Sequence, residues 1–185
     1  LQVGNDLNKY ALKDFHFHIH SEHTLDGLLF PMEMHMLHER EINGVKSFLA
    51  VGRWIKEGLE NAVLKAMFDN LPPVPALTAP LNPPINPFII QTFMLDGLLP
   101  AANMRSSYRY HGSLTTGLTE IDGQAKSLTP VSWVMFKEPL AMSRDQIAKY
   151  RNHFPNGNWR ETWPINLANR ADYALMTDVG VPEPS

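Results

Sequence analysis

Apolar and polar side chains alternate from Tyr10 to Ile19, which is the pattern of a β-strand with one face turned toward a core. The apolar members are Phe15, Phe17 and Ile19, and the polar members on the other face are Asp14, His16, His18 and His20. An Asp26-Gly27 pair then signals a hairpin turn. After it, Met32, Met34 and Met36 alternate with Glu33, His35 and Leu37. The pattern predicts two antiparallel strands that carry histidines on adjacent faces.

Further strands and two helices are predicted downstream. The pattern predicts a strand over Ser47–Ile55, after the turn signal at Asn43-Gly44. It predicts another over Val131–Phe136. Gly58–Asn70 predicts a helix, because it carries apolar residues at helical spacing: Leu59, Ala62, Val63, Ala66 and Met67. Ser143 and Gln146 form a capping box that opens a second helix, which ends near Asn152.

Two regions have little periodicity. The stretch Leu71–Pro87 holds seven prolines, which remove backbone donors, so we expect an ordered surface excursion or a linker within one domain. The C-terminal tail is expected to be irregular and polar. We therefore predict a single domain over residues 1–185.

Composition narrows the chemistry. The chain has 185 residues, is 44% hydrophobic and carries a formal net charge of -3, with no basic run, so we expect no nucleic-acid partner. No segment approaches the roughly 20 apolar residues that span a bilayer, and the first residues lack a signal-peptide pattern, so we expect a mature, soluble chain. Because cysteine is absent, a transition metal must bind histidines and carboxylates.

The histidine spacing predicts a zinc site. Side chains of His16 and His18 point to the same side of a strand, with Cβ atoms about 6.6–7 Å apart, and both rings can reach one ion. His35 supplies a third ligand from the paired strand, and Glu33 shares its face and can bind its second ring nitrogen. Three neutral imidazoles leave zinc its full charge and a free fourth position, where a bound water has a pKa of about 7.

The alternative is that these histidines are ordinary surface or hydrogen-bonded core residues, since a His-x-His pair by itself is a weak motif. The other three histidines of this segment are not assigned as ligands. His20 shares the parity of His16 but lies where the chain turns at Ser21, His23 lacks a suitable neighbour, and His38 has the parity opposite to that of His35.

Three ordered blocks resemble one family. FHFHIHSEHTLDGLLFPMEMHMLHE is similar to the zinc-binding hairpin of the α-carbonic anhydrases. The second block resembles the family's Y-GSLTT and W-V-KEP segments and consists of YRYHGSLTT and WVMFKEPLAMSRDQIAKYR. The third block resembles the family's C-terminal segment and reads NWRETWPINLANR. The resemblance implies a mostly β fold: a twisted, largely antiparallel central sheet with a few short surface helices. It also implies a conical pocket that has zinc at its base.

The resemblance assigns roles residue by residue. It makes His16, His18 and His35 the zinc ligands, and it makes Thr115 and Glu22 a catalytic pair in which the Thr hydroxyl donates to the carboxylate and accepts from zinc-bound hydroxide. The implied outer partners are Glu33 for His35, the backbone carbonyl of Asn158 for His18, and Asp14 for His16. The family usually has Gln at this last position, and an anionic Asp makes the metal less acidic.

The implied reaction is the reversible hydration of carbon dioxide to bicarbonate by attack of zinc-bound hydroxide. The apolar substrate pocket is assigned to Leu37, Ala50, Leu114, Thr116, Val131 and Trp133. Without the resemblance, the apolar members of this set are ordinary core residues.

The chain also departs from the family pattern. Nothing corresponds to the family's N-terminal segment, which carries a QSPI-like motif and usually a proton-relaying His, so no proton shuttle is assigned. GLTEIDGQAKSLTP is an insertion beside the active-site rim. The family suggests secretion or an organelle lumen, but no disulfide supports that compartment.

Two other functions stay open at this point. One is a catalytically reduced, carbonic-anhydrase-like subunit with protein partners in a larger assembly. The other is a zinc hydrolase of a different fold, which uses the same histidines but does not explain SLTT or KEP.

Overall fold

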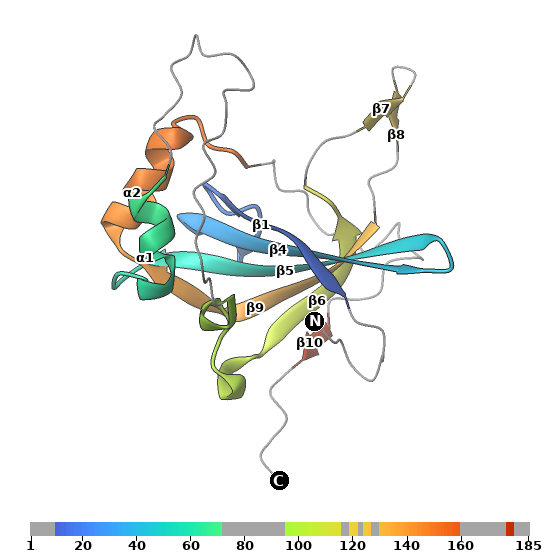
Figure 1. Ribbon diagram of the computed structural model, residues 1–185, viewed down its shortest axis with the longest axis horizontal. Helices are drawn as coiled ribbons and strands as arrows, with labels where there is room; N and C mark the ends of the chain where they lie inside the picture. The colour runs from blue at the N-terminus through green and yellow to red at the C-terminus, as the bar shows by residue number, and fades with distance from the viewer. Residues whose placement is uncertain are drawn as a thin grey trace.

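The computed structural model describes residues 10–71, 95–115, 119–121, 124–126, 130–159 and 177–179. Their centre is a six-stranded sheet in the order β1-β4-β5-β9-β6-β10 (Figure 1). The strands are β1 Ala11–His18, β4 Met32–Ile42, β5 Val45–Glu57, β6 Ser107–Ser113, β9 Pro130–Met142 and β10 Thr177–Val179. The expected mostly β fold is confirmed, with one mixed feature: β5 and β9 run parallel, whereas the other neighbours run antiparallel.

Both turn signals close hairpins, but Asp26-Gly27 closes a separate two-stranded hairpin instead of joining the two histidine-bearing strands directly. Asp26 and Gly27, with φ of 51° and 78°, join β2 Thr24–Leu25 to β3 Leu28–Leu29. Asn43 and Gly44, with φ of 52° and 78°, join β4 to β5. Both pairs have positive φ at both central positions, which a two-residue turn needs in order to match the twist of its strands.

Alternation along the strands gives the sheet two different faces. One face carries Phe17, Met34 and Val51 in a large apolar core. The other carries Ala50, Val131 and Trp133 in a smaller aromatic cluster. The predicted parity of the methionines is confirmed, because Met32, Met34 and Met36 all lie in the large core.

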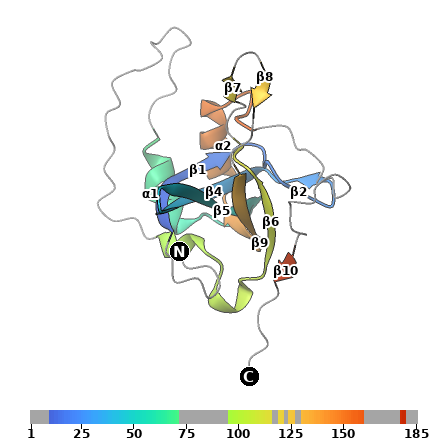
Figure 2. The same ribbon diagram turned by 90° about the vertical axis from the view of Figure 1, so that its right-hand side faces the viewer.

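Two helices pack on the large core at one end of the sheet, where Figures 1 and 2 show them together: α1 Ala62–Asp69 and α2 Arg144–His153. The capping box predicted for α2 is present. The helix predicted over Gly58–Asn70 is shorter, because the Asn61 side chain accepts from the Leu64 amide and caps it there. Of the apolar residues noted at helical spacing, Val63 and Met67 pack against the large core, whereas Leu59 precedes the helix and is 86% exposed.

Smaller elements complete the described chain. The 3₁₀ helices η1 Leu95–Leu98 and η2 Ala102–Met104 precede β6. A separate hairpin, β7 Thr119–Ile121 with β8 Gln124–Lys126, lies within the predicted insertion. The tail was expected to be irregular, but β10 pairs with β6. Most of the proline-rich stretch lies outside the described residues, and none of the described helices has the length and hydropathy that crossing a bilayer requires.

Candidate metal centre

Strand pairing brings three histidines together on the face opposite the large core. His16 on β1 lies directly across from His35 on β4, and His18 lies two residues further along β1. The ring centroids are 4.9 Å apart for His16 and His18, 5.3 Å for His16 and His35, and 4.7 Å for His18 and His35. One ring nitrogen from each lies within 4.8 Å of the other two. This spacing suits three ligands around one tetrahedral ion.

Each of these rings uses one nitrogen for an outer partner. His16 Nδ1 binds the Asp14 carboxylate. His18 Nδ1 lies 2.7 Å from the Asn158 carbonyl oxygen, and His35 Nε2 lies 2.5 Å from Glu33 Oε1. Because a carbonyl or carboxylate accepts the N–H, the other nitrogen of each ring keeps a lone pair. The lone pairs are those of His16 Nε2, His18 Nε2 and His35 Nδ1.

A buried, unsatisfied nitrogen tests whether zinc fits. His18 Nε2 has no hydrogen-bond partner among the described residues and is shielded from solvent. A buried acceptor without a partner costs about 1–3 kcal/mol, so such atoms in native proteins usually have a function. An ion bound by the three lone pairs removes this cost. The residues present therefore fit zinc.

A second group of possible ligands shares His35 with the first and consists of His23, Glu33 and His35. Its carboxylate is already engaged: Glu33 accepts from the His23 amide at 2.9 Å, from His23 Nδ1 at 2.5 Å and from His35 Nε2. A metal here would have to displace these donors. The donor set thus favours the three-histidine group.

Glu33 is fully buried and ionised. Burial pushes the pKa of its carboxyl upward, but the charge of His23 and the hydrogen bonds from His23 and His35 outweigh burial and hold this pKa far below its ordinary value. Burial also lowers the pKa of His35, so this ring is neutral near pH 7. A neutral imidazole beside a carboxylate is the form in which histidine binds metals.

His23 extends this chain of hydrogen bonds to β6. Its Nε2 contacts the Tyr110 hydroxyl, and its ring packs on Trp133 with centroids 4.8 Å apart. His23 Nδ1–H donates to Glu33, and His23 Nε2 shares a hydrogen bond with the Tyr110 hydroxyl. The order of hydrogen bonds from Tyr110 through His23 and Glu33 then leaves a lone pair on His35 Nδ1. His23 is outside the three-histidine group, but it orients that group's outer partner.

Asn158 fixes the end of β1. Its side chain donates to the Phe17 carbonyl at 2.9 Å and accepts from the Ile19 amide at 2.8 Å, while its backbone amide donates to the Ile19 carbonyl at 3.1 Å. Tyr150 on α2 donates to the same Phe17 carbonyl at 2.6 Å, and burial raises the pKa of Tyr150 to about 12. The backbone on both sides of His18 is thereby held in place.

The residues expected to form the catalytic pair and those expected to line the pocket have different surroundings. Glu22 is buried, with carboxylate oxygens 3.4 Å from His18 Nδ1 and 3.9 Å from His35 Nδ1. Thr115 is half-buried after β6, and Thr116 lies outside the described residues. The other five expected pocket residues share one apolar cluster, namely Leu37, Ala50, Leu114, Val131 and Trp133. Trp133 reaches the metal site, because its ring centroid lies 4.8 Å from that of His35.

Gly52 lies opposite His35 on β5. A Cβ at this position would meet the Met135 side chain and lie 3.6 Å from His35 Cδ2. The distance to His35 is an ordinary contact, so it is the close approach of the Met135 side chain that glycine accommodates here.

Comparison with known proteins shows the family of this chain. The family model for the eukaryotic-type carbonic anhydrases matches residues 2–173. The chain belongs to the α-carbonic anhydrase family. A carbonic anhydrase of Klebsiella pneumoniae is 30% identical over 161 residues, which are 87% of this chain and 57% of that protein. Carbonic anhydrase 3 of Rattus norvegicus is 29% identical over 189 residues, 89% of this chain and 66% of the relative.

Solved α-carbonic anhydrases share the fold. The enzyme of Thermovibrio ammonificans in complex with the inhibitor sulfanilamide superposes with a TM-score of 0.63 at 34% identity, covering 88% of this chain and 62% of that one. The Photobacterium profundum α-carbonic anhydrase superposes with a TM-score of 0.64 at 28% identity, covering 88% of this chain and 64% of that one. The chain thus spans less than two thirds of the length of these relatives.

Sequence analysis missed several supporting residues. His23 was set aside because it is not a ligand, and Tyr110 and Tyr150 carried no signal of their own. The contact between Tyr110 and His23 joins residues 87 positions apart. The contact between Tyr150 and Phe17 joins residues 133 positions apart, which no local pattern can reveal.

Proposed function

We propose that His16, His18 and His35 bind zinc and that the site catalyses the reversible hydration of carbon dioxide to bicarbonate and a proton. The observation that carries this proposal is the set of three imidazoles, each with one nitrogen engaged by an outer partner and the other in reach of a common centre. Bound zinc supplies a hydroxide nucleophile near neutral pH, because it lowers the pKa of a water to about 7.

The chain's own residues orient the reactants. In this proposal the Thr115 hydroxyl donates its hydrogen to the Glu22 carboxylate and has only lone pairs left to offer. It therefore accepts a hydrogen bond from the nucleophile and directs the nucleophile's lone pair at the substrate carbon. Burial of Glu22 supports this role, since a carboxylate held away from water exchanges its partners less readily.

The apolar cluster suits the substrate. Carbon dioxide is small and carries no net charge, so it is better accommodated than bicarbonate by a wall of Leu37, Val131 and Trp133. The product is an anion, and the same wall favours its release. The proposal requires zinc as the cofactor and carbon dioxide and water as the substrates.

Stopped-flow hydration of carbon dioxide tests the proposal on zinc-loaded protein. We expect activity that rises when an imidazole buffer is added, because the buffer replaces a proton shuttle. Thr115→Ala should keep zinc bound and lower the rate on the order of 10²-fold. Fully loaded protein that is inactive with and without imidazole would contradict the enzymatic proposal and favour a structural subunit. Activity that Thr115→Ala leaves unchanged would contradict only the role of Thr115.

A further inference from the structure

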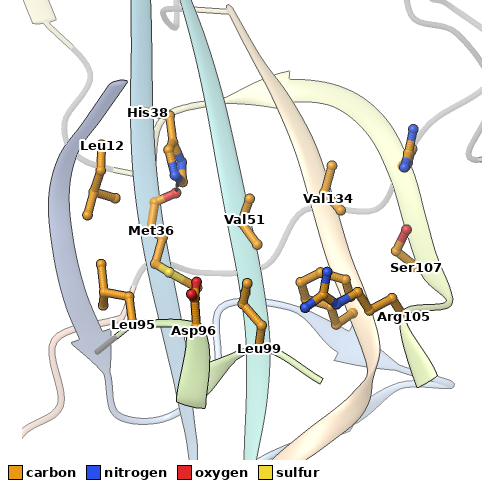
Figure 3. A pocket seen from close by; sticks show the side chains of 12 residues that line it. Leu12, Met36, His38, Val51, Leu95, Asp96, Leu99, Arg105, Ser107 and Val134 are labelled. Carbon is orange, nitrogen blue, oxygen red and sulfur yellow. Dashed lines mark hydrogen bonds between the residues drawn. The ribbon is translucent and has the colours of Figure 1, made fainter. Parts of the chain in front are cut away.

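A cavity of about 440 Å³ lies on the sheet face opposite the metal site. Figure 3 shows its floor, which is formed by Met36 on β4, Val51 on β5 and Val134 on β9. Leu95 and Leu99 line it from the η1 region. Its volume falls in the range of about 300–1,000 Å³ that is usual for small-molecule sites.

The polar groups of this cavity are unevenly placed. Arg105, Ser107 and Arg109 line it on the β6 side, and Figure 3 shows Asp96 across from Arg105, beside Leu95 and Leu99. Arg109 Nε is shielded from solvent and has no hydrogen-bond partner in the described part of the chain. A buried N–H donor without an acceptor indicates a missing partner. The cavity therefore has two charged sides. The cationic side lacks a hydrogen-bond acceptor, and the acidic side lies opposite it.

The remaining titratable group is neutral. His38 Nδ1 donates to the Met36 carbonyl at 3.0 Å, and burial lowers the pKa of this ring. His38 therefore adds no cation near pH 7. The charges that face a ligand are the two guanidiniums and Asp96.

Two hydrogen-bonded arginines hold the cavity in shape. The buried guanidinium of Arg53 donates to the Leu98 carbonyl at 2.6 Å and to the Glu138 carbonyl at 2.8 Å, which ties η1 to β9. Arg105 Nε donates to the Pro100 carbonyl at 3.1 Å and so fixes its own guanidinium at the rim. A wall fixed before binding lowers the entropic cost of holding a ligand.

We propose that this cavity binds an amphipathic monocarboxylate, with its hydrocarbon chain on Met36, Val51 and Val134 and its carboxylate held by Arg105 and Arg109. Guanidiniums pair with carboxylates in a planar, two-pronged geometry that no neutral head group reproduces. Asp96 repels a second carboxylate at the far end of a ligand, so dicarboxylates are disfavoured. The proposal is independent of the metal centre and of carbon dioxide hydration.

Isothermal titration calorimetry of the full chain with three ligands of matched length tests this proposal. Octanoate carries one carboxylate, suberate carries one at each end, and octylammonium carries a cation. We expect octanoate to bind with one site per chain, and the other two to bind at least about tenfold more weakly. Equal or tighter binding of octylammonium, or no binding of octanoate, would overturn the proposal.

Variants of two exposed residues locate the ligand in the cavity. Arg105 and Asp96 are both exposed. Arg105→Gln should weaken octanoate about tenfold, whereas Asp96→Asn should leave octanoate unchanged and strengthen suberate. Arg144→Gln is the matched control, since Arg144 pairs with Glu57 outside the cavity. This variant should change neither the octanoate affinity nor the suberate affinity. Octanoate binding that Arg105→Gln leaves unchanged, or that disappears when zinc is removed, would contradict this site.

Discussion

His35 and His38 lie on the same strand and are 2% and 7% exposed, yet their surroundings differ completely. Burial lowers the pKa of both rings, so burial does not distinguish them. His35 donates to a buried carboxylate and faces His16 and His18, whereas His38 donates to a backbone carbonyl and lines a cavity on the other face. Strand parity therefore decides which buried histidine can bind a metal.

Removing each ring in turn tests whether His35 and His38 differ in metal binding. Loss of an outer partner lowers metal affinity by about 10–100-fold. His35→Ala should lower zinc affinity by more than this, because it deletes a ligand. His38→Ala should leave zinc affinity unchanged. Competition with a chromophoric chelator measures both. Equal losses in the two variants would show that metal binding depends on the stability of β4 rather than on its face.

Glu33 sharpens the comparison, because His38 has no carboxylate partner. Glu33→Gln removes the charge that fixes the His35 tautomer, and we expect zinc affinity to fall by about 10–100-fold. Glu41→Gln, on the exposed end of β4, is the control and should have no effect. If both variants bind zinc like the unmodified chain, the outer partner has no role. His23→Gln, which removes a donor to Glu33, should cause a smaller loss in the same assay.

Gly52 tests whether the metal face of the sheet is as tightly packed as the distances indicate. Gly52→Ala should cost about 1–3 kcal/mol of unfolding free energy, since the added Cβ collides with Met135. Gly58→Ala places its Cβ 3.1 Å from that of Ala141 and should cost less. Urea unfolding measures both. A Gly52→Ala variant as stable as the unmodified chain would show that Met135 moves aside freely.

The pH dependence of stability gives the smallest expected effect. Because burial lowers the pKa of His38, the unfolded chain binds a proton below about pH 6.5 that the folded chain resists. The unfolding free energy should therefore fall with decreasing pH, by at most about 1.4 kcal/mol per pH unit from this group. His38→Gln should flatten that part of the slope in urea unfolding between about pH 6.5 and 5. An unchanged slope would contradict a neutral, buried His38.

Local pattern was sufficient for the hairpins and for the parity of the histidines, because turn chemistry and strand alternation act over a few residues. His16 and His35 could be placed on facing strands for that reason. The parallel pairing of β5 with β9 could not be predicted, since it joins strands about 80 residues apart with no local signal. The same holds for Tyr110, which reaches His23 across the sheet.

X-ray absorption at the zinc edge tests whether His16, His18 and His35 bind the metal, because it counts the imidazoles bound to zinc in the protein as purified. We expect three histidine nitrogens and one oxygen, all at about 2.0–2.1 Å. The alternative group of His23, Glu33 and His35 supplies only two imidazoles and a carboxylate. A spectrum with two imidazoles, or a chain that binds no zinc, would contradict the assignment of His16, His18 and His35.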